Sequence, residues 1–270
     1  MWLILITDSS IRNMFALLFT LCSVFLIGDA SFVGSLNKCS MSDSECHKKL
    51  YQSVISDIGK IGVKELGIPP VDPLELKNVS VSILGLLDIS LEDGIVKGVK
   101  DCLLNNVTTD IPNGHFYLDM TCDITVKGHY KAFSSSPLIK TLLGGEFIRA
   151  DGMGKVRVEK LHLNLDFAIY AYKADDGEIY LTSIYDQTKY DSEILGKLVF
   201  EGNNIFMGKQ DISALAISLL NQAGKSMAPY FGRAFMEKSL EFVYAYCGKF
   251  FEVVPARYYI KEDLTPFVKQ

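Results

Sequence analysis

The chain contains 270 residues, of which 49% are hydrophobic and 22% are charged, and its formal net charge is −5. This composition is too apolar and too evenly mixed for a disordered or fibrous protein. The acidic balance supplies no basic field for a phosphate backbone, so we expect no nucleic-acid partner. A chain of this length can bury a large core without the help of a metal ion.

Residues 1–30 are predicted to form a secretory signal peptide. The apolar run Met14–Ile27 follows Arg12, and small residues lead to an expected cleavage site after Ala30, which is the order of regions in such signals. A membrane anchor is the alternative interpretation, but the run is shorter than the roughly 20 residues that span a bilayer. Met14, which opens this run, is an alternative start of translation. We expect a secreted, extracellular protein with one domain over residues 31–270 and no stable membrane insertion after cleavage.

The cysteines and glycosylation motifs fit an extracellular protein. Cys39 and Cys46 enclose a short loop that a disulfide would tie down. Five cysteines remain after the signal peptide, so Cys247 is left as a buried thiol or as an intermolecular bridge. N-glycosylation motifs begin at Asn78 and Asn106, each of which requires an exposed side chain.

A predicted hairpin supplies the second disulfide. The segments Ile95–Val107 and Phe116–Val126 flank a turn that contains proline and glycine. If the hairpin folds about Pro112, Cys102 and Cys122 are cross-strand neighbours at a distance that suits a disulfide. A register slip of one residue would separate the two side chains.

The periodicity of apolar residues changes along the chain. Spacings of three and four over Glu45–Lys64 predict an amphipathic helix, which Gly67–Pro70 ends. From Leu76 to about Val199, apolar and polar residues alternate as in antiparallel strands with one exposed face. Asp176–Gly177 is a typical hairpin turn within this region.

A long helix is predicted from Asp211, its expected N-cap, to about Phe251. Pro229 is expected to kink this helix, because it removes a backbone donor. At about 100° per residue, one apolar face runs along the helix and would pack on the sheet. This face consists of Ile212, Leu215, Ala216, Leu219, Leu220, Ala223, Met227, Tyr230, Phe231 and Ala234.

Four motifs follow one another along the chain. The first, ELGIPPVDPLEL, comes after the cysteine pair and its helix, and the others lie before, within and after the long helix. They occupy Glu65–Leu76, Leu198–Asn203, Leu220–Gln222 with Pro229, and Tyr258–Phe267. In this order they resemble the insect takeout and haemolymph juvenile-hormone-binding proteins, and the resemblance extends over almost all of residues 39–267.

This resemblance implies an α+β fold, the tubular lipid-binding module. In this module a strongly curved antiparallel sheet wraps around a long C-terminal helix, and the two enclose an apolar tunnel. A further helix lies at the N-terminus. The resemblance also implies a carrier of a juvenile-hormone-like isoprenoid, a fatty acid or a related lipid, with neither catalysis nor a cofactor. Leu86–Gly94 is more similar to the mite group 7 allergens, which share the module, and Cys102 and Cys122 are not part of the takeout signature.

The lining of the tunnel is predicted from the inward residues of the strands and the long helix. A buried CH₂ group contributes about 0.8 kcal/mol, so a long hydrocarbon ligand needs no charged partner. The alternative interpretation is that each of these residues belongs to the ordinary hydrophobic core and contacts no ligand. The expected lining is Leu118, Met120, Leu163, Leu165, Phe167, Leu219, Ala223, Met227, Tyr230 and Phe231, and the candidate partners of a polar head group are Tyr170, Tyr172, Tyr185 and Tyr230.

Other function classes are less well supported by the sequence. The motifs of nucleophile elbows, zinc proteases, P-loops and C-x-x-C sites do not occur, so we do not expect an enzyme. The four histidines do not share metal-ligand spacing, and no metal site is expected. The alternative function is an innate-immune or allergen-like protein that binds bacterial lipid or a protein partner through its surface. Against it, basic residues cluster only at Lys48–Lys49. The sequence does not decide whether the chain forms a homodimer or binds a receptor.

Overall fold

The computed structural model describes residues 31–134, 136–142 and 144–269. Contacts divide the chain into two compact units, residues 1–36 and 37–270. In the first unit, α2 spans Phe32–Ser35, and the expected signal peptide lies outside the described residues. The second unit contains the whole sheet. Side chains that are not described within these ranges are those of Ile139, Leu142, Met227, Tyr230, Phe231, Ala234, Tyr246 and Cys247.

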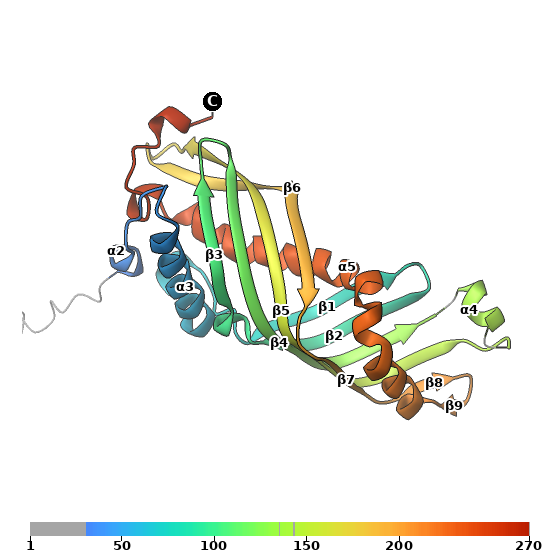
Figure 1. The fold of residues 1–270 in the computed structure, drawn as a ribbon. Helices are drawn as coiled ribbons and strands as arrows, with labels where there is room; N and C mark the ends of the chain where they lie inside the picture. The colour runs from blue at the N-terminus through green and yellow to red at the C-terminus, as the bar shows by residue number, and fades with distance from the viewer. Residues whose placement is uncertain (1–30, 135, 143, 270) are drawn as a thin grey trace, which may run out of the picture. The chain divides into compact units, whose positions relative to one another are not determined.

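The second unit combines one large sheet with a long C-terminal helix and shorter helices (Figure 1). The helices are α3 (Ser44–Ile61), α4 (Pro137–Leu142) and α5 (Ser213–Val253), with short 3₁₀ helices η2 (Lys64–Leu66), η3 (Val99–Asp101), η4 (Ala256–Tyr258) and η5 (Thr265–Phe267). The strands are β1 (Leu74–Ile83), β2 (Leu87–Lys97), β3 (Leu103–Asp110), β4 (His115–Phe133), β5 (Ile148–Lys173), β6 (Ile179–Ile194), β7 (Leu198–Gly202), β8 (Ile205–Met207) and β9 (Gln210–Asp211). The predicted α+β class is confirmed.

The strands pair antiparallel in the order β1-β2-β4-β5-β8-β9, while β3 pairs with β4, and β6 and β7 pair with β5. The sheet is strongly curved, and α5 runs along one of its faces (Figure 1). The sheet does not close on itself. The predicted arrangement of a curved sheet around a long helix is therefore confirmed, but as an open wrap. Pro229 lies inside α5, and the helix changes direction along its length.

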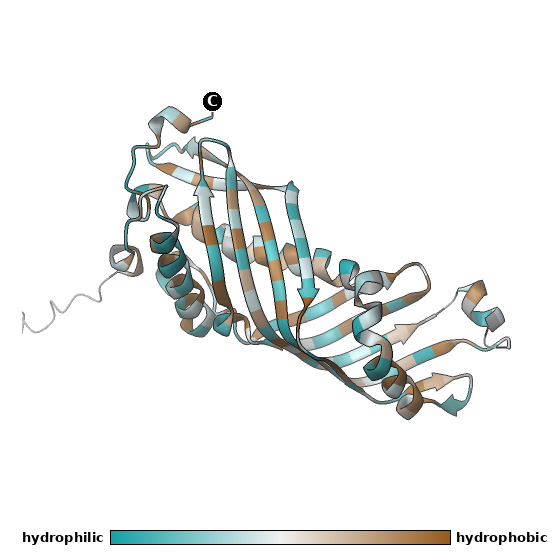
Figure 2. Ribbon diagram, viewed as in Figure 1, coloured by the Kyte–Doolittle hydropathy of each residue, from teal (hydrophilic) through white to brown (hydrophobic). Residues whose placement is uncertain are grey.

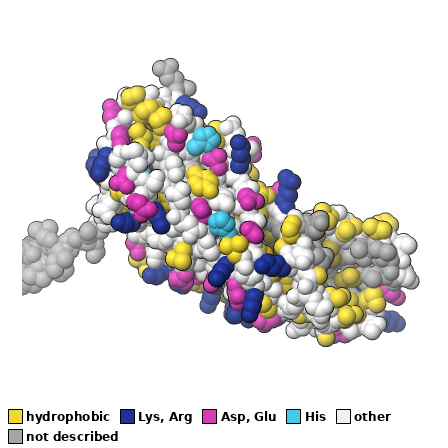
Figure 3. Space-filling model, viewed as in Figure 1, with side chains coloured by type: hydrophobic (Ala, Val, Ile, Leu, Met, Phe, Trp, Pro, Cys, Tyr) yellow, Lys and Arg dark blue, Asp and Glu magenta, His cyan; other side chains and the backbone are white. Residues whose placement is uncertain are grey.

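Side chains alternate along the strands, so that apolar and polar residues follow one another (Figure 2). In β5, Leu163 and Leu165 face the side that α5 covers, whereas His162 and Asp166 face the opposite side. On that polar face, Figure 3 shows basic side chains interspersed with acidic ones. Cross-strand pairs of opposite charge stabilise such a face. The histidine–carboxylate pairs on it are His115–Asp166, His129–Glu92, His129–Asp151 and His162–Asp119.

The Cys102–Cys122 disulfide is present, as predicted, but the hairpin differs from the prediction. Near the turn, Asp110 lies opposite His115, which is one residue away from the register that would align the two cysteines. A bulge at Asn105 shifts the pairing and brings the cysteines together.

The prediction that Ile95–Val107 is one strand is wrong. Residues 87–97 belong to β2, and Gly98 and η3 separate them from β3. Gly98 has a φ of 108°, a backbone conformation that favours glycine. A Cβ atom at this position would lie 1.9 Å from the carbonyl oxygen of Asp123, so the close packing also requires glycine. The predicted strand is therefore interrupted at Gly98, although the alternation of apolar and polar residues continues through this position in the sequence.

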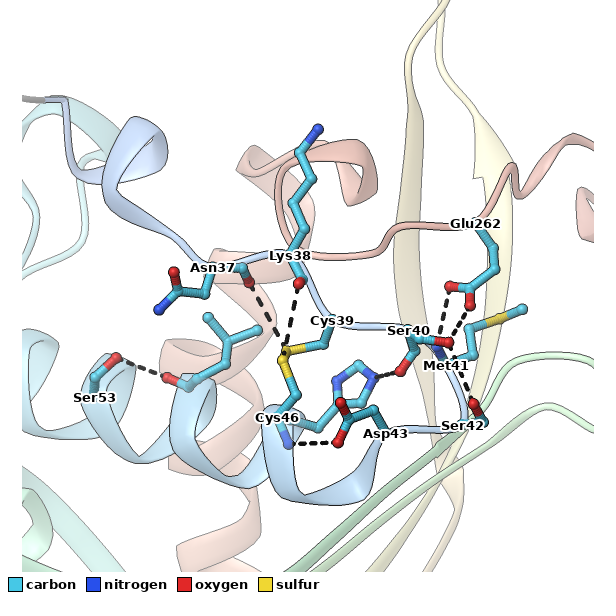
Figure 4. Close-up of a disulfide and its surroundings, with 12 residues drawn as sticks. Asn37, Lys38, Cys39, Ser40, Met41, Ser42, Asp43, Cys46, Ser53 and Glu262 are labelled. Atoms are coloured by element: carbon cyan, nitrogen blue, oxygen red, sulfur yellow. Dashed lines mark hydrogen bonds between the residues drawn. A yellow bond between two sulfur atoms is a disulfide. The ribbon is translucent and has the colours of Figure 1, made fainter.

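The Cys39–Cys46 disulfide, also predicted, lies where the two ends of the second unit meet (Figure 4). The backbone N–H of Cys39 donates to the carbonyl oxygen of Tyr259 at 2.9 Å. The carboxylate of Glu262 accepts from the backbone N–H of Met41 at 3.0 Å. The closing sequence motif is thus held against the segment that precedes α3 by hydrogen bonds from two backbone N–H groups.

The first turn of α5 differs from the prediction. Asp211 is not the N-cap, because it belongs to β9 and pairs with Phe206 of β8. The helix starts at Ser213 and Ile212 holds the N-cap position. The carboxylate of Asp211 still accepts from the N–H of Ser213 at 2.8 Å, so it satisfies one free donor of the first turn.

The N-terminal half of α5 packs through only part of the predicted face. Leu215 and Leu219 are 59% and 55% exposed, so the prediction that they pack on the sheet is wrong. Asn221 fixes how this half of the helix is rotated about its axis. Its side-chain amide accepts from the N–H of Phe200 at 2.7 Å and donates to the carbonyl oxygen of Phe200 at 2.9 Å. These two bonds turn a polar residue toward β7. Ile212 and Ala216 of the predicted face do pack on the sheet, together with Ile217, against Ala132, Ala150 and Ile205 of β4, β5 and β8.

Gly128 generates a prediction about the packing of β2 on β4. A Cβ atom at Gly128 would lie 2.0 Å from the carbonyl oxygen of Asp93 and 2.6 Å from the Cα of Gly94. Because both are backbone atoms of a paired strand, Gly128→Ala is expected to lower the free energy of unfolding by about 2–3 kcal/mol, measured by urea denaturation.

Gly248→Ala in α5 is the matched control. No described atom beyond its own helix lies within 4 Å of the added Cβ, so alanine is expected to be neutral or to stabilise by up to about 1 kcal/mol. Equal unfolding free energies for the Gly128→Ala variant and the unmodified chain would contradict the close packing of β2 on β4.

Candidate functional site

A cavity of about 1280 Å³ lies between the apolar face of the sheet and helices α3 and α5. Its volume is above the range of about 300–1,000 Å³ that is usual for small-molecule sites. Most of the wall consists of aliphatic and aromatic side chains from β1, β2 and β4–β7 and from the two helices. Most strands contribute alternate residues to this wall, as their two-residue period requires, whereas β6 contributes every residue from Thr188 to Ile194.

The five strand residues predicted to line a tunnel all lie on the cavity wall. In the register of β4 and β5, Leu118 lies opposite Leu165 and Met120 lies opposite Leu163. Phe167 continues the row along β5. These side chains form one continuous apolar surface toward α5.

The contribution of α5 to the wall comes mainly from its C-terminal half, which the sequence pattern missed. Leu219 and Ala223 are not on the wall, and the side chains of Met227, Tyr230 and Phe231 lie outside the described residues. The aromatic density of residues 242–251 is the signal that points to this half. Apolar wall residues of α5 are Ala228, Pro229, Phe235, Met236, Leu240, Phe242, Val243, Tyr244, Phe250 and Phe251.

Three of the four tyrosines predicted to meet a polar head group are not on the cavity wall. Tyr170 and Tyr172 pack near each other, with ring centroids 6.4 Å apart, and neither is on the wall. The Tyr185 hydroxyl donates to the carbonyl oxygen of Glu237 at 3.4 Å, and Tyr230 has no described side chain. The described tyrosines on the wall are Tyr51, Tyr190 and Tyr244.

An aromatic cluster forms the part of the wall next to α3. Tyr51 packs edge-on against Phe116, with centroids 5.2 Å apart, and lies 6.1 Å from Phe251. Burial raises the pKa of both Tyr51 and Tyr259 above the ordinary value. The Thr109 hydroxyl partly offsets this effect on the pKa of Tyr51. The hydroxyls of Tyr51, Thr109 and Tyr259 are nevertheless buried without a partner in hydrogen-bond geometry.

Every charged residue on the described wall belongs to β6 or α5. Charged side chains stay in water unless they are paired, so the cavity reaches solvent along these two elements. We name this boundary the β6–α5 rim and define it by its cavity-facing polar residues. They are Thr188, Tyr190 and Ser192 of β6 and Lys225, Arg233 and Lys238 of α5, and Lys189, Asp191 and Glu193 of β6 border the cavity as well.

Three further expectations concern positions outside the cavity. Asn78 and Asn106 are both exposed, which satisfies the condition for glycosylation at either motif. The side chain of Cys247 lies outside the described residues. Within the described ranges, no helix is long and apolar enough to cross a membrane.

Comparisons with known proteins agree with this architecture. The sequence model of the haemolymph juvenile hormone binding protein family matches residues 15–261. Among solved structures, 14 chains match. One is the crystal structure of Epiphyas postvittana Takeout 1, with 23% identity, coverage of 84% of this chain and 100% of that chain, and a TM-score of 0.73. No curated protein matches the chain significantly.

The buried hydroxyls yield a stability prediction. Tyr51→Phe and Tyr259→Phe each remove a hydroxyl that has no partner in hydrogen-bond geometry, and an unmade hydrogen bond costs about 1–3 kcal/mol. Both variants are therefore expected to unfold at the same or a higher urea concentration than the unmodified chain. Tyr180→Phe is the control, because its hydroxyl donates to Asp176 at 2.8 Å and its loss is expected to destabilise by about 1 kcal/mol. A loss of the same size for Tyr51→Phe would mean that its hydroxyl is bonded, for example to a buried water molecule.

Proposed function

We propose that this chain, which belongs to the haemolymph juvenile hormone binding protein family, is a secreted carrier of a small hydrophobic ligand. The cavity between the apolar face of the sheet and α5 is the observation that carries this proposal. The ligand classes that we propose are a juvenile-hormone-like isoprenoid, a fatty acid or a related lipid.

The apolar wall supports binding through burial alone. Each CH₂ group transferred from water to such a wall contributes about 0.8 kcal/mol. A ligand with about a dozen such groups therefore gains about 10 kcal/mol before the costs of association are subtracted. The wall residues Leu118, Met120, Leu163, Leu165 and Phe167 are proposed as ligand contacts.

The positions of the histidines support a role without catalysis. His115, His129 and His162 pair with carboxylates on the polar face of the sheet, which the cavity does not touch. His47 is buried near the Cys39–Cys46 disulfide, and its Nε2 lies 2.9 Å from the carbonyl oxygen of Ser40. On the described wall no histidine accompanies a candidate nucleophile.

Secretion is supported by the disulfides and by the glycosylation motifs. Disulfides persist in oxidising compartments, and both predicted pairs are formed here. We propose that residues 1–30 direct export and that Asn78 and Asn106 carry glycans, since both asparagines are exposed.

Filling part of the cavity is expected to weaken ligand binding. Val126 and Thr125 are adjacent and nearly isosteric residues of β4, but only Val126 lies on the cavity wall. Val126→Trp should lower the affinity for the neutral fluorescent probe N-phenyl-1-naphthylamine by about tenfold or more, because the indole occupies the ligand's space. Fluorescence titration of the purified, delipidated protein measures this affinity.

Thr125→Trp is the matched control and should leave the affinity within about twofold, because its side chain points to the polar face. The unfolding midpoints of both variants identify any loss of fold. If the unmodified protein takes up neither the probe nor any offered lipid, the carrier function is refuted.

A further inference from the structure

The β6–α5 rim is bounded by two polar links. β6 is hydrogen-bonded to β5 on one side, and its other side faces α5. At one end of the rim, the hydroxyl of Thr188 contacts the hydroxyl of Tyr244. At the other end, the ammonium group of Lys225 donates to the carbonyl oxygens of Leu195 at 3.4 Å and Gly196 at 3.2 Å. The strand residues between these links border the cavity.

The cross-strand register separates inward from outward residues of β6. Tyr190 lies opposite Leu165 and Ser192 lies opposite Leu163, and both leucines are on the cavity wall. The charged residues of β6 alternate with these two and lie opposite residues of the polar face. They are Lys189, Asp191 and Glu193, opposite Asp166, Asn164 and His162. Lys189, Asp191 and Glu193 nevertheless border the cavity. The three charges that α5 adds to the rim are all positive.

The three rim cations differ in how their charge is compensated. Arg233 donates through Nε to Glu237 at 2.9 Å, and Lys238 pairs with Glu241. Both pairs are close to solvent, where ion pairs contribute little, so a ligand anion can compete with them. Lys225 contacts backbone carbonyl oxygens, and within the described part of the chain it has no ion pair. Its positive charge is therefore the least compensated of the three cations of α5.

We infer that the β6–α5 rim binds the anionic head group of a single-chain lipid whose tail fills the cavity, with Lys225 as the main partner and Arg233 as the second. A carboxylate at this place forms a charge-assisted hydrogen bond while it keeps part of its hydration. No charge has to enter the apolar wall, which would be costly. This inference rests on the proposed function and narrows the proposed ligand classes to lipids with an anionic head group.

Palmitate and methyl palmitate test the inference, because they share a tail and differ in the charge of the head group. Lys225→Met is expected to weaken palmitate binding by about five- to tenfold and to leave methyl palmitate within about twofold. Arg233→Gln should weaken palmitate by a smaller factor. Affinities are measured by displacement of N-phenyl-1-naphthylamine at low and high salt, and high salt should weaken palmitate alone.

Lys49→Met provides the matched control, since Lys49 is exposed on α3 and is not on the cavity wall. It removes the same charge and should change neither affinity. The inference is overturned if Lys225→Met leaves palmitate binding unchanged, or if it weakens both lipids equally. If the unmodified protein binds neither lipid, the proposed function fails and this inference fails with it.

Discussion

One constraint governs this structure: the apolar face of a single long sheet must be kept from water by very few covering elements. β4 and β5 are 19 and 26 residues long, so their alternation produces a broad apolar surface. A helix has a narrow contact face, and α5 with the help of α3 covers this surface without filling the space beneath it. The cavity is therefore a result of the mismatch between one wide sheet and two helices. The polar face of the same strands needs no cover, because its charges pair with one another across the sheet.

The parts of the fold that depend on local pattern could be predicted from the sequence. Two-residue alternation placed Leu118, Met120 and Leu163 on the correct face, because a strand offers only two directions. The Cys102–Cys122 pair was predicted from a register that holds only beyond the bulge at Asn105. Sequence does not show such a bulge, since it is fixed by the packing of neighbouring strands. The prediction of one strand over Ile95–Val107 failed for a similar reason, because the break at Gly98 depends on the close approach of Asp123.

The side of the site formed by α5 could not be predicted in the same way. A helix can rotate about its axis, and an apolar stripe fixes this rotation only when no polar contact competes. Asn221 makes such a contact, because its side-chain amide hydrogen-bonds to both the N–H and the carbonyl oxygen of Phe200. That contact leaves Leu215 and Leu219 exposed, and the wall is supplied by the aromatic half of the helix. The rim could not be predicted either, since it is formed by residues far apart in sequence, such as Tyr190 and Lys225, that border the same cavity only in the folded chain.

The junction between the two ends of the second unit bears on the order in which the protein is made. Cys39 and Cys46 are separated by seven positions and can pair soon after they emerge during synthesis. Met41 and Glu262 are 221 positions apart, and Cys39 pairs with Tyr259 and Ile260 over a similar separation. Synthesis proceeds from the N-terminus, so these partners and most of α5 arrive last. The sheet therefore exists for a time with its apolar face uncovered, a stage at which aggregation competes with folding. The cavity is complete only when the last residues are in place, so the proposed ligand binding requires the finished protein and not the nascent chain.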